Sequence, residues 1–145
     1  MNNKTTDLII QKTFNATIDR VWQALTDPEQ MKQWYFDLPG FKAEVGYEFS
    51  FVVSNDKHEW SHLCKVTEVK PKKLLAYTWR YDGYSGDSLV RFELFGEGDK
   101  TRLVLTHSGL HTFPADAEAL KRENFEKGWD EIINTSLAKF LEEQK

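Results

Sequence analysis

Hydrophobic residues near the C-terminal end of the chain recur at spacings of three and four, which is the period of a helix that buries one side. Polar and charged residues fill most of the positions between them, and the apolar members of the stripe are Phe125, Trp129, Ile132, Ile133, Leu137, Phe140 and Leu141. We therefore predict one long amphipathic helix over residues 114–143. At 1.5 Å per residue it would be about 40 Å long, enough to cross a small domain.

Gly128 interrupts this stripe directly before Trp129. A glycine in a helix interior costs roughly 1 kcal/mol relative to alanine. Two interpretations stay open. The glycine allows close packing or a slight bend, or the helix is thinner there and leaves space beneath it.

Upstream of this helix, apolar and polar residues alternate, which is the period of strands with one buried face. The predicted strands cover residues 8–15, 47–53, 58–70, 74–81, a segment around Phe92, and 101–108. Thr17 and Asp27-Pro28 are capping signals for two short helices after the first strand. Strands joined by short turns, such as Asn55-Asp56, pair antiparallel. We predict an α+β fold in which a curved six-stranded antiparallel sheet grips the long helix.

Composition narrows the class of protein. The 145 residues suit a single domain over residues 1–145 with a flexible tail over residues 1–6. The net charge of -4 argues against nucleic-acid binding. Apolar runs are too short to span a bilayer, so we expect no stable membrane insertion. Cys64 is alone, which excludes a disulfide framework and suits a reducing cytoplasm. We expect a cytoplasmic monomer.

Histidines and aromatic residues are the candidate chemistry. His58 and His62 would lie about 13 Å apart along a strand, too far to share one metal ion, so we predict no metal site and no cofactor. His107 falls on the inward face of its strand, where it would either hold a ligand or be satisfied by a backbone carbonyl or Ser108. Ten Phe, five Trp and five Tyr exceed what a core of this size usually needs. Stacking walls of this kind suit flat, mostly apolar molecules.

Five segments, in this order, resemble the helix-grip SRPBCC superfamily. They are TFNATIDRVWQALTDPEQMKQWY, FKAEVGYEFSF, VTEVKPKKLLAYTWR, TRLVLTHSGL and GWDEIINTSLAKFLE. The chain is most similar to the branch that resembles the C-terminal domain of activators of the heat-shock-protein-ninety ATPase. The resemblance implies a cavity between the sheet and the long helix and does not imply a reaction. Those activators carry a further N-terminal domain, which this chain is too short to hold.

The first hypothesis is non-catalytic binding of a small hydrophobic or aromatic ligand, such as a lipid, polyketide or flavonoid-like molecule, under the long helix. The predicted ligand-binding residues are Phe49, Phe51, Trp60, His62, Tyr77, Trp79, Phe92, Leu105, His107, Trp129 and Ile133. The second hypothesis is a chaperone partner that contacts a heat-shock ATPase in the stress response. The third is a cyclase- or hydrolase-like enzyme with His107 as acid–base, for which one histidine without a partner is thin support.

Overall fold

The computed structural model describes residues 7–38, 40–54, 59–114, 120 and 122–143. Its strands are β1 (Leu8–Phe14), β2 (Glu48–Ser54), β3 (Glu59–Lys70), β4 (Leu74–Tyr81), β5 (Ser88–Glu97) and β6 (Lys100–Ser108). Its helices are α1 (Ile18–Thr26), α2 (Pro28–Trp34), η1 (Leu110–Thr112), α3 (Arg122–Asp130), η3 (Glu131–Leu137) and α4 (Ala138–Glu143). The predicted tail over residues 1–6 and the predicted Asn55-Asp56 turn lie outside the described residues.

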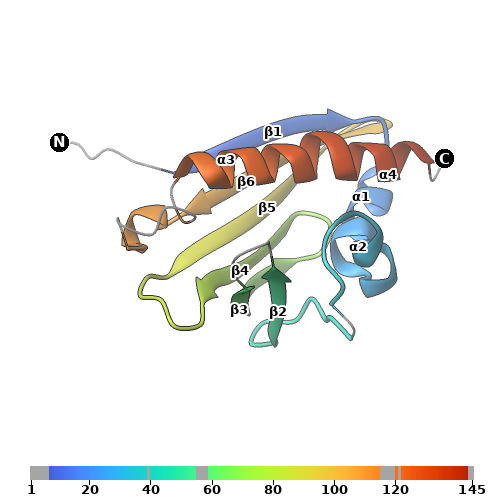
Figure 1. Ribbon diagram of the computed structural model, residues 1–145. Coiled ribbons are helices and arrows are strands. Elements are labelled where there is room, and N and C mark those ends of the chain that lie inside the picture. Colours follow the sequence, from blue (N-terminus) through green and yellow to red (C-terminus); the bar gives the residue numbers. More distant parts are fainter. Residues whose placement is uncertain (1–6, 39, 55–58, 115–119, 121, 144–145) are drawn as a thin grey trace.

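Among the described residues the strands form one six-stranded sheet in the order β1-β6-β5-β4-β3-β2, with antiparallel neighbours throughout. The long C-terminal helix lies across one face of this sheet, and α1 and α2 gather at one end (Figure 1). This confirms the predicted α+β architecture, including the two short helices after the first strand.

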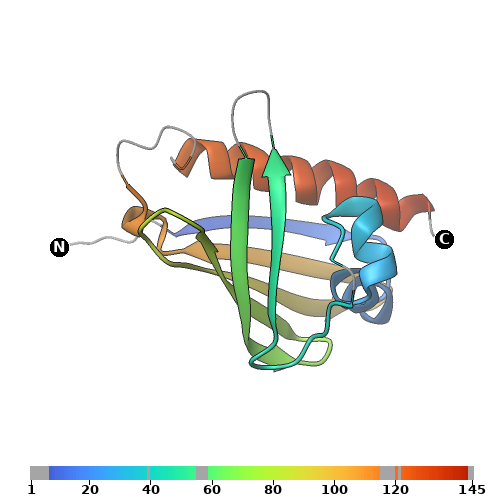
Figure 2. The ribbon, with the colours of Figure 1, turned by 60° about the horizontal axis from the view of Figure 1, so that its bottom comes forward.

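The sheet is strongly curved. The register between β3 and β4 shifts between Val66 and Glu68, as at a β-bulge, and bulges bend a strand and increase its twist. Figure 2 shows β2 and β3 running across the direction of β1 and β6. Because of this turn, residues of β2, β3 and β4 line one space together with residues of α3.

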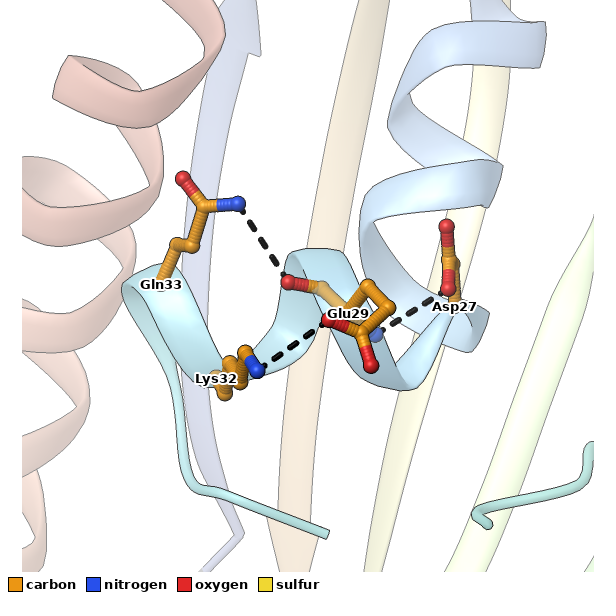
Figure 3. A network of polar contacts seen from close by, with 4 residues as sticks. All are labelled: Asp27, Glu29, Lys32 and Gln33. Atoms are coloured by element: carbon orange, nitrogen blue, oxygen red, sulfur yellow. Dashed lines mark hydrogen bonds and ion pairs between the residues drawn. The ribbon is translucent and has the colours of Figure 1, made fainter. Parts of the chain in front are cut away.

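The junction of α1 and α2 is fixed by local hydrogen bonds (Figure 3). The amide of Asp27 donates to the carbonyl of Gln23 and ends α1. Its carboxylate accepts from the amide of Glu29 at 3.1 Å and begins α2, where Pro28 occupies the first turn. Glu29 also pairs with Lys32 at 3.1 Å. The sequence signal Asp-Pro therefore sets the direction in which α2 leaves α1.

The long helix begins later than predicted. Pro114 is not helical, Leu120 lies in a 3-10 turn, and α3 starts at Arg122. Residues 115–119 and 121 of the predicted helix lie outside the described residues. The connection first folds inward, because buried Phe113 packs 5.5 Å from the ring of Tyr81 and stacks 5.9 Å from Phe125. Burial of Phe113 in this connection explains why the helix does not start at Pro114.

The middle of the long helix, η3, is π-helical. Five buried residues of the helix, Phe125, Trp129, Ile133, Leu137 and Leu141, follow one another at intervals of four. In an α-helix four residues turn by about 400°, so the row would drift by about 160° over the four steps. A π-helix bonds each residue to the fifth along and turns less per residue. The π segment therefore keeps the whole row against the sheet.

The end of the long helix is also anchored. The guanidinium of Arg20 in α1 donates to the carbonyl of Leu141 in α4 at 2.9 Å. A cation that bonds a last-turn carbonyl satisfies an orphan acceptor and suits the helix dipole. The helix is thus held at its C-terminal end, while its first turns border the space described next.

Candidate functional site

A cavity of about 260 Å³ lies between α3 and the β2–β4 side of the sheet. The residues that line it come from the loop after α2, from β2, β3 and β4, and from one side of the long helix. They are Phe36, Val53, His62, Trp79, Tyr81, Asn124, Phe125, Gly128, Trp129 and Ile132. None of these residues is charged. The cavity is therefore an apolar space walled by rings, with a few neutral polar groups.

Aromatic rings form its walls. Trp79 of β4 and Trp129 of α3 lie 5.4 Å apart between ring centroids, tilted by 57°. On the β2 side, Phe51 stacks against both Phe36 and His62 at 4.4 Å between ring centroids, and Phe36 and His62 lie 6.3 Å from each other. Such offset and tilted pairs are the geometries that aromatic quadrupoles favour. The rings hold one another, which keeps the walls in place without filling the space between them.

Phe36 reaches the cavity because α2 is locked to the core. The Trp34 indole donates to the Ala24 carbonyl at 2.9 Å. The next residue, Tyr35, shares a hydrogen bond of 2.6 Å with the hydroxyl of Tyr77 in β4. Burial of these two hydroxyls raises the pKa of both, so the pair is neutral. Phe36, which follows directly, is held at the cavity by these two bonds.

His62 is one of the neutral polar groups in the wall. Its Nδ1 lies 3.0 Å from the Trp60 carbonyl, which can only accept, so Nδ1 carries the proton. Burial lowers the pKa of His62 to about 4, against the opposing effect of backbone contacts with Trp60 and Phe51. At neutral pH the ring is uncharged and Nε2 is an acceptor.

Tyr81 supplies the second polar group. Its hydroxyl accepts a hydrogen bond of 2.8 Å from the Trp79 indole and keeps its own proton to donate. Burial raises the pKa of Tyr81 despite this bond, so the phenol stays protonated. The rings of Tyr81 and His62 lie 4.7 Å apart. A donor and an acceptor thus stand side by side at one wall.

His107 is less exposed than His62, and both of its ring nitrogens form hydrogen bonds. The Trp129 indole donates to its Nδ1 at 2.9 Å, which fixes the proton of the neutral ring on Nε2. That Nε2–H donates to Ser88 Oγ at 2.8 Å, and the Ser88 hydroxyl donates to the Trp79 carbonyl at 2.6 Å. Burial lowers the pKa of His107 to about 3. The chain of bonds ties α3 to β6, β5 and β4 and leaves His107 no nitrogen for a ligand or for acid–base chemistry. Its partner is Ser88, and Ser108 plays no part.

The structure separates the predicted ligand-binding residues into a first group that lies at or near the cavity and a second group that lies in the packed core. His62, Trp79 and Trp129 line the cavity. Phe51 and Trp60 touch its lining rings from outside, and Phe49 lies further along β2, edge-on to Tyr77. The remaining predicted residues are fully or almost fully buried in the packed core: Tyr77, Phe92, Leu105, His107 and Ile133. A ligand role for this second group would require the core to open.

Several lining residues are absent from the sequence-based prediction. Val53 and Tyr81 follow the inward alternation of their strands, and Phe125 and Ile132 belong to the apolar stripe, so a signal existed for these four. Asn124 and Phe36 carried none, because Asn124 is a polar helix residue and Phe36 lies in a loop without periodicity. The long-range hydrogen bond of Tyr35 with Tyr77 and the bond of Trp34 with Ala24 bring Phe36 to the cavity.

Gly128 borders the cavity on the exposed side of α3. A Cβ atom built at this position meets nothing within 4 Å. Close packing is therefore not the reason for the glycine, and the space beside it is open. The interpretation that the helix leaves space beneath it stays a prediction.

A larger groove, of about 560 Å³, runs along β2, β3 and β4 and is a different kind of surface. Its lining includes the exposed charged residues Glu48, Lys65, Arg80 and Asp87. Glu48, Lys65 and Arg80 alternate along their strands with inward residues, so these charges lie on the outer face of the sheet. The charges and the exposure of the groove make it a poor match for an apolar guest.

Metal-binding clusters and membrane-spanning helices are both absent from the described part of the chain. Within it no group of three or more His, Cys, Asp or Glu side chains could hold a metal ion. No helix in the same residues has the length and apolar character needed to cross a membrane.

The fold has many solved counterparts. The crystal structure of Mll3558 from Rhizobium loti superposes with a TM-score of 0.81 at 23% identity, covering 95% of this chain and 98% of that one. The solution structure of BH1534 from Bacillus halodurans gives 0.72 at 27% identity, covering 95% and 99%. DynU16, from the dynemicin biosynthetic locus, gives 0.77 at 23% identity, with 98% of this chain and 49% of that one covered.

Sequence comparison agrees with the fold. A search of curated proteins returned no match. Residues 15–142, which include every element from α1 to the last turns of the long helix, match the family described as activator of Hsp90 ATPase homolog 1-like protein. Together with the helix-grip architecture, this match shows that the chain belongs to the activator of Hsp90 ATPase homolog 1-like family of the SRPBCC superfamily.

Proposed function

We propose that this protein binds an uncharged small hydrophobic or aromatic molecule, without transforming it, in the cavity between α3 and the sheet. The observation that carries the proposal is the lining itself: a space of about 260 Å³ walled by Phe36, Trp79, Phe125 and Trp129, with no charged side chain among its lining residues. Mostly apolar pockets with a few placed polar groups are typical of small-molecule sites.

The polar groups define what the guest would carry. Neutral His62 offers an acceptor and Tyr81 a donor, so one hydroxyl or amide group on an otherwise flat apolar guest would satisfy both. Burial of about 300 Å² of apolar guest surface would contribute roughly 7 kcal/mol before the costs of association. Roughly 7 kcal/mol corresponds to a dissociation constant of about 10 μM. With the association costs partly offset by the two hydrogen bonds, we expect dissociation constants of roughly tens to hundreds of micromolar.

The same lining would reject charged guests. A carboxylate or sulfonate would lose its hydration without gaining a cation, which is costly. We therefore narrow the expected guests to uncharged flat molecules and exclude fatty acids in their ionised form. That one structural neighbour comes from a small-molecule biosynthetic locus supports a small organic guest.

A matched pair of fluorescent probes tests the proposal. N-phenyl-1-naphthylamine is uncharged, and 8-anilinonaphthalene-1-sulfonate is the same framework with one sulfonate. We expect the uncharged probe to bind with micromolar affinity and the sulfonate at least about tenfold more weakly. Equal or stronger binding of the sulfonate, or no binding of the uncharged probe, would contradict the proposed function.

A second function rests on the family match alone. The family is described by a likeness to an activator of the Hsp90 ATPase, so surface contact with a heat-shock ATPase is an independent proposal. We also propose that the protein is a cytoplasmic monomer. A reducing compartment suits the single buried Cys64, because burial raises the pKa of its thiol to about 12 and keeps it protonated. A pull-down with a purified Hsp90-type ATPase and a measurement of its ATP turnover test this second function. No capture and unchanged ATP turnover would contradict it.

A further inference from the structure

Gly128 differs from glycines that a positive φ or a close contact makes necessary. At Gly86, for comparison, φ is +111° and a Cβ would lie 2.6 Å from the ring of Phe113, so only glycine fits. Gly128 is the seventh residue of α3, has no positive φ, and would bring a Cβ to within 4 Å of nothing. The helix would be more stable with alanine at this position. No packing or conformational reason for the glycine is found.

The location of Gly128 supplies a reason. Asn124 and Ile132 lie one turn before and one turn after it, and all three line the cavity. Side chains at intervals of four share one side of a helix. In this row the outer members carry side chains and the middle member carries none. The row is therefore a wall with a gap at its centre, and Gly128 is exposed at that gap.

The opposite side of the gap is apolar. The cavity residues that face α3 are Phe36 from the loop after α2, Val53 from β2, His62 from β3, and Trp79 and Tyr81 from β4. Phe36 and Val53 are half-buried, whereas Trp79 and Tyr81 are buried. The hydrogen-bonding groups of His62 and Tyr81 therefore belong to the more buried part of this lining.

We propose that Gly128 is the entrance of the cavity, through which an uncharged flat molecule enters and leaves past the bare backbone of α3. This inference rests on the proposed function and adds a route to it. It predicts that a side chain at position 128 obstructs passage more than it alters the bound state. Rates of binding and release would then change together.

Stopped-flow fluorescence with N-phenyl-1-naphthylamine measures both rates. We expect Gly128→Leu to slow binding and release at least about tenfold each, with a smaller change in the dissociation constant. Gly128→Ala, with a much smaller side chain, should slow them only slightly. The control is Lys139→Leu, which places the same side chain on an exposed position of α4 away from the cavity and should leave both rates unchanged.

Thermal unfolding without probe provides an independent readout. Gly128→Ala should raise Tm by about 3 °C, because the helix gains propensity and the new methyl group meets no neighbour. A lower Tm would show that the glycine is structural and would overturn the inference. Unchanged rates in Gly128→Leu would overturn it as well. Absence of probe binding to the wild-type protein is a separate result that contradicts the proposed function.

Discussion

His62 and His107 lie in two regions of the same inward face, and the regions behave differently. Both rings are buried, and burial lowers the pKa of both. His107 stands in a closed chain from Trp129 to Ser88 in which every nitrogen has a partner. His62 stands in a cavity wall, with one nitrogen held by the Trp60 carbonyl. The first region joins helix to sheet, and the second leaves space between them.

The difference lies in what the helix places opposite each histidine. The Trp129 indole reaches His107 and completes its hydrogen bonds. The part of the helix that lines the His62 cavity includes Gly128, which has no side chain. Strand periodicity puts both histidines inward with equal strength, so the strand pattern alone cannot distinguish a structural histidine from one in a binding site.

The largest expected effect separates the two regions by substitution. His107→Ala leaves the Trp129 indole without its acceptor, removes one of the two hydrogen bonds of Ser88 and creates a void, so we expect a loss of about 4 kcal/mol in the free energy of unfolding. His62→Ala should cost about 1–2 kcal/mol, because the enlarged space adjoins the cavity and water can enter it. Urea unfolding measures both, with exposed His111→Ala as a neutral control. Equal losses at positions 62 and 107 would contradict the comparison.

Acidification is expected to act next most strongly. In the folded protein the pKa is about 4 for His62 and about 3 for His107, below the usual 6.5. Below pH 6.5 the unfolded chain therefore binds more protons than the folded chain. Stability is therefore full above pH 6.5 and is lost as the pH falls toward the folded values. Each histidine should contribute a loss of about 2 kcal/mol between pH 7 and pH 5.

Chemical unfolding at several pH values measures this slope. His62→Gln removes one titrating ring and should reduce the slope by about half between pH 7 and pH 5. A wild-type stability that does not change across this range would mean that the rings are accessible to protons in the folded protein.

Trp129→Phe is expected to have a smaller effect on stability. It keeps most of the ring but removes the donor to His107 Nδ1, so we expect a loss of about 1–2 kcal/mol. Trp34→Phe is the matched control, since it also loses a buried indole bond, to the Ala24 carbonyl, away from the cavity. Both variants should be destabilised, and only Trp129→Phe should weaken N-phenyl-1-naphthylamine binding. A Trp129→Phe protein as stable as the wild type would show that the bond to His107 contributes nothing.

Much of the fold follows from local patterns. Thr17 and Asp27 cap the short helices as expected, because capping depends on neighbouring residues alone. The start of the long helix does not follow from them, since the connection before it folds inward to bury Phe113, a long-range effect. The π segment is also hard to predict. Its signal is the row of apolar residues at intervals of four from Phe125 to Leu141, and a search for spacings of three or four does not distinguish this row from an ordinary α-helical stripe.

The candidate site was only partly predictable for a related reason. Alternation places Trp79 and His62 inward but does not reveal which inward residues face a void and which are packed. That depends on the β3–β4 bulge and on the approach of Phe36. Gly128 is visible in the sequence as a residue that costs stability in its own helix, but the sequence alone does not decide between its two interpretations.

The central claim, that the cavity under α3 takes a guest, is tested most directly by the indole N–H resonances of the protein titrated with N-phenyl-1-naphthylamine. Trp79 and Trp129 line the cavity, and Trp34 donates to a carbonyl elsewhere in the core. We predict that the Trp79 and Trp129 signals shift with saturation and the Trp34 signal does not. Saturable fluorescence without shifts at Trp79 and Trp129 would place the probe elsewhere and contradict the claim.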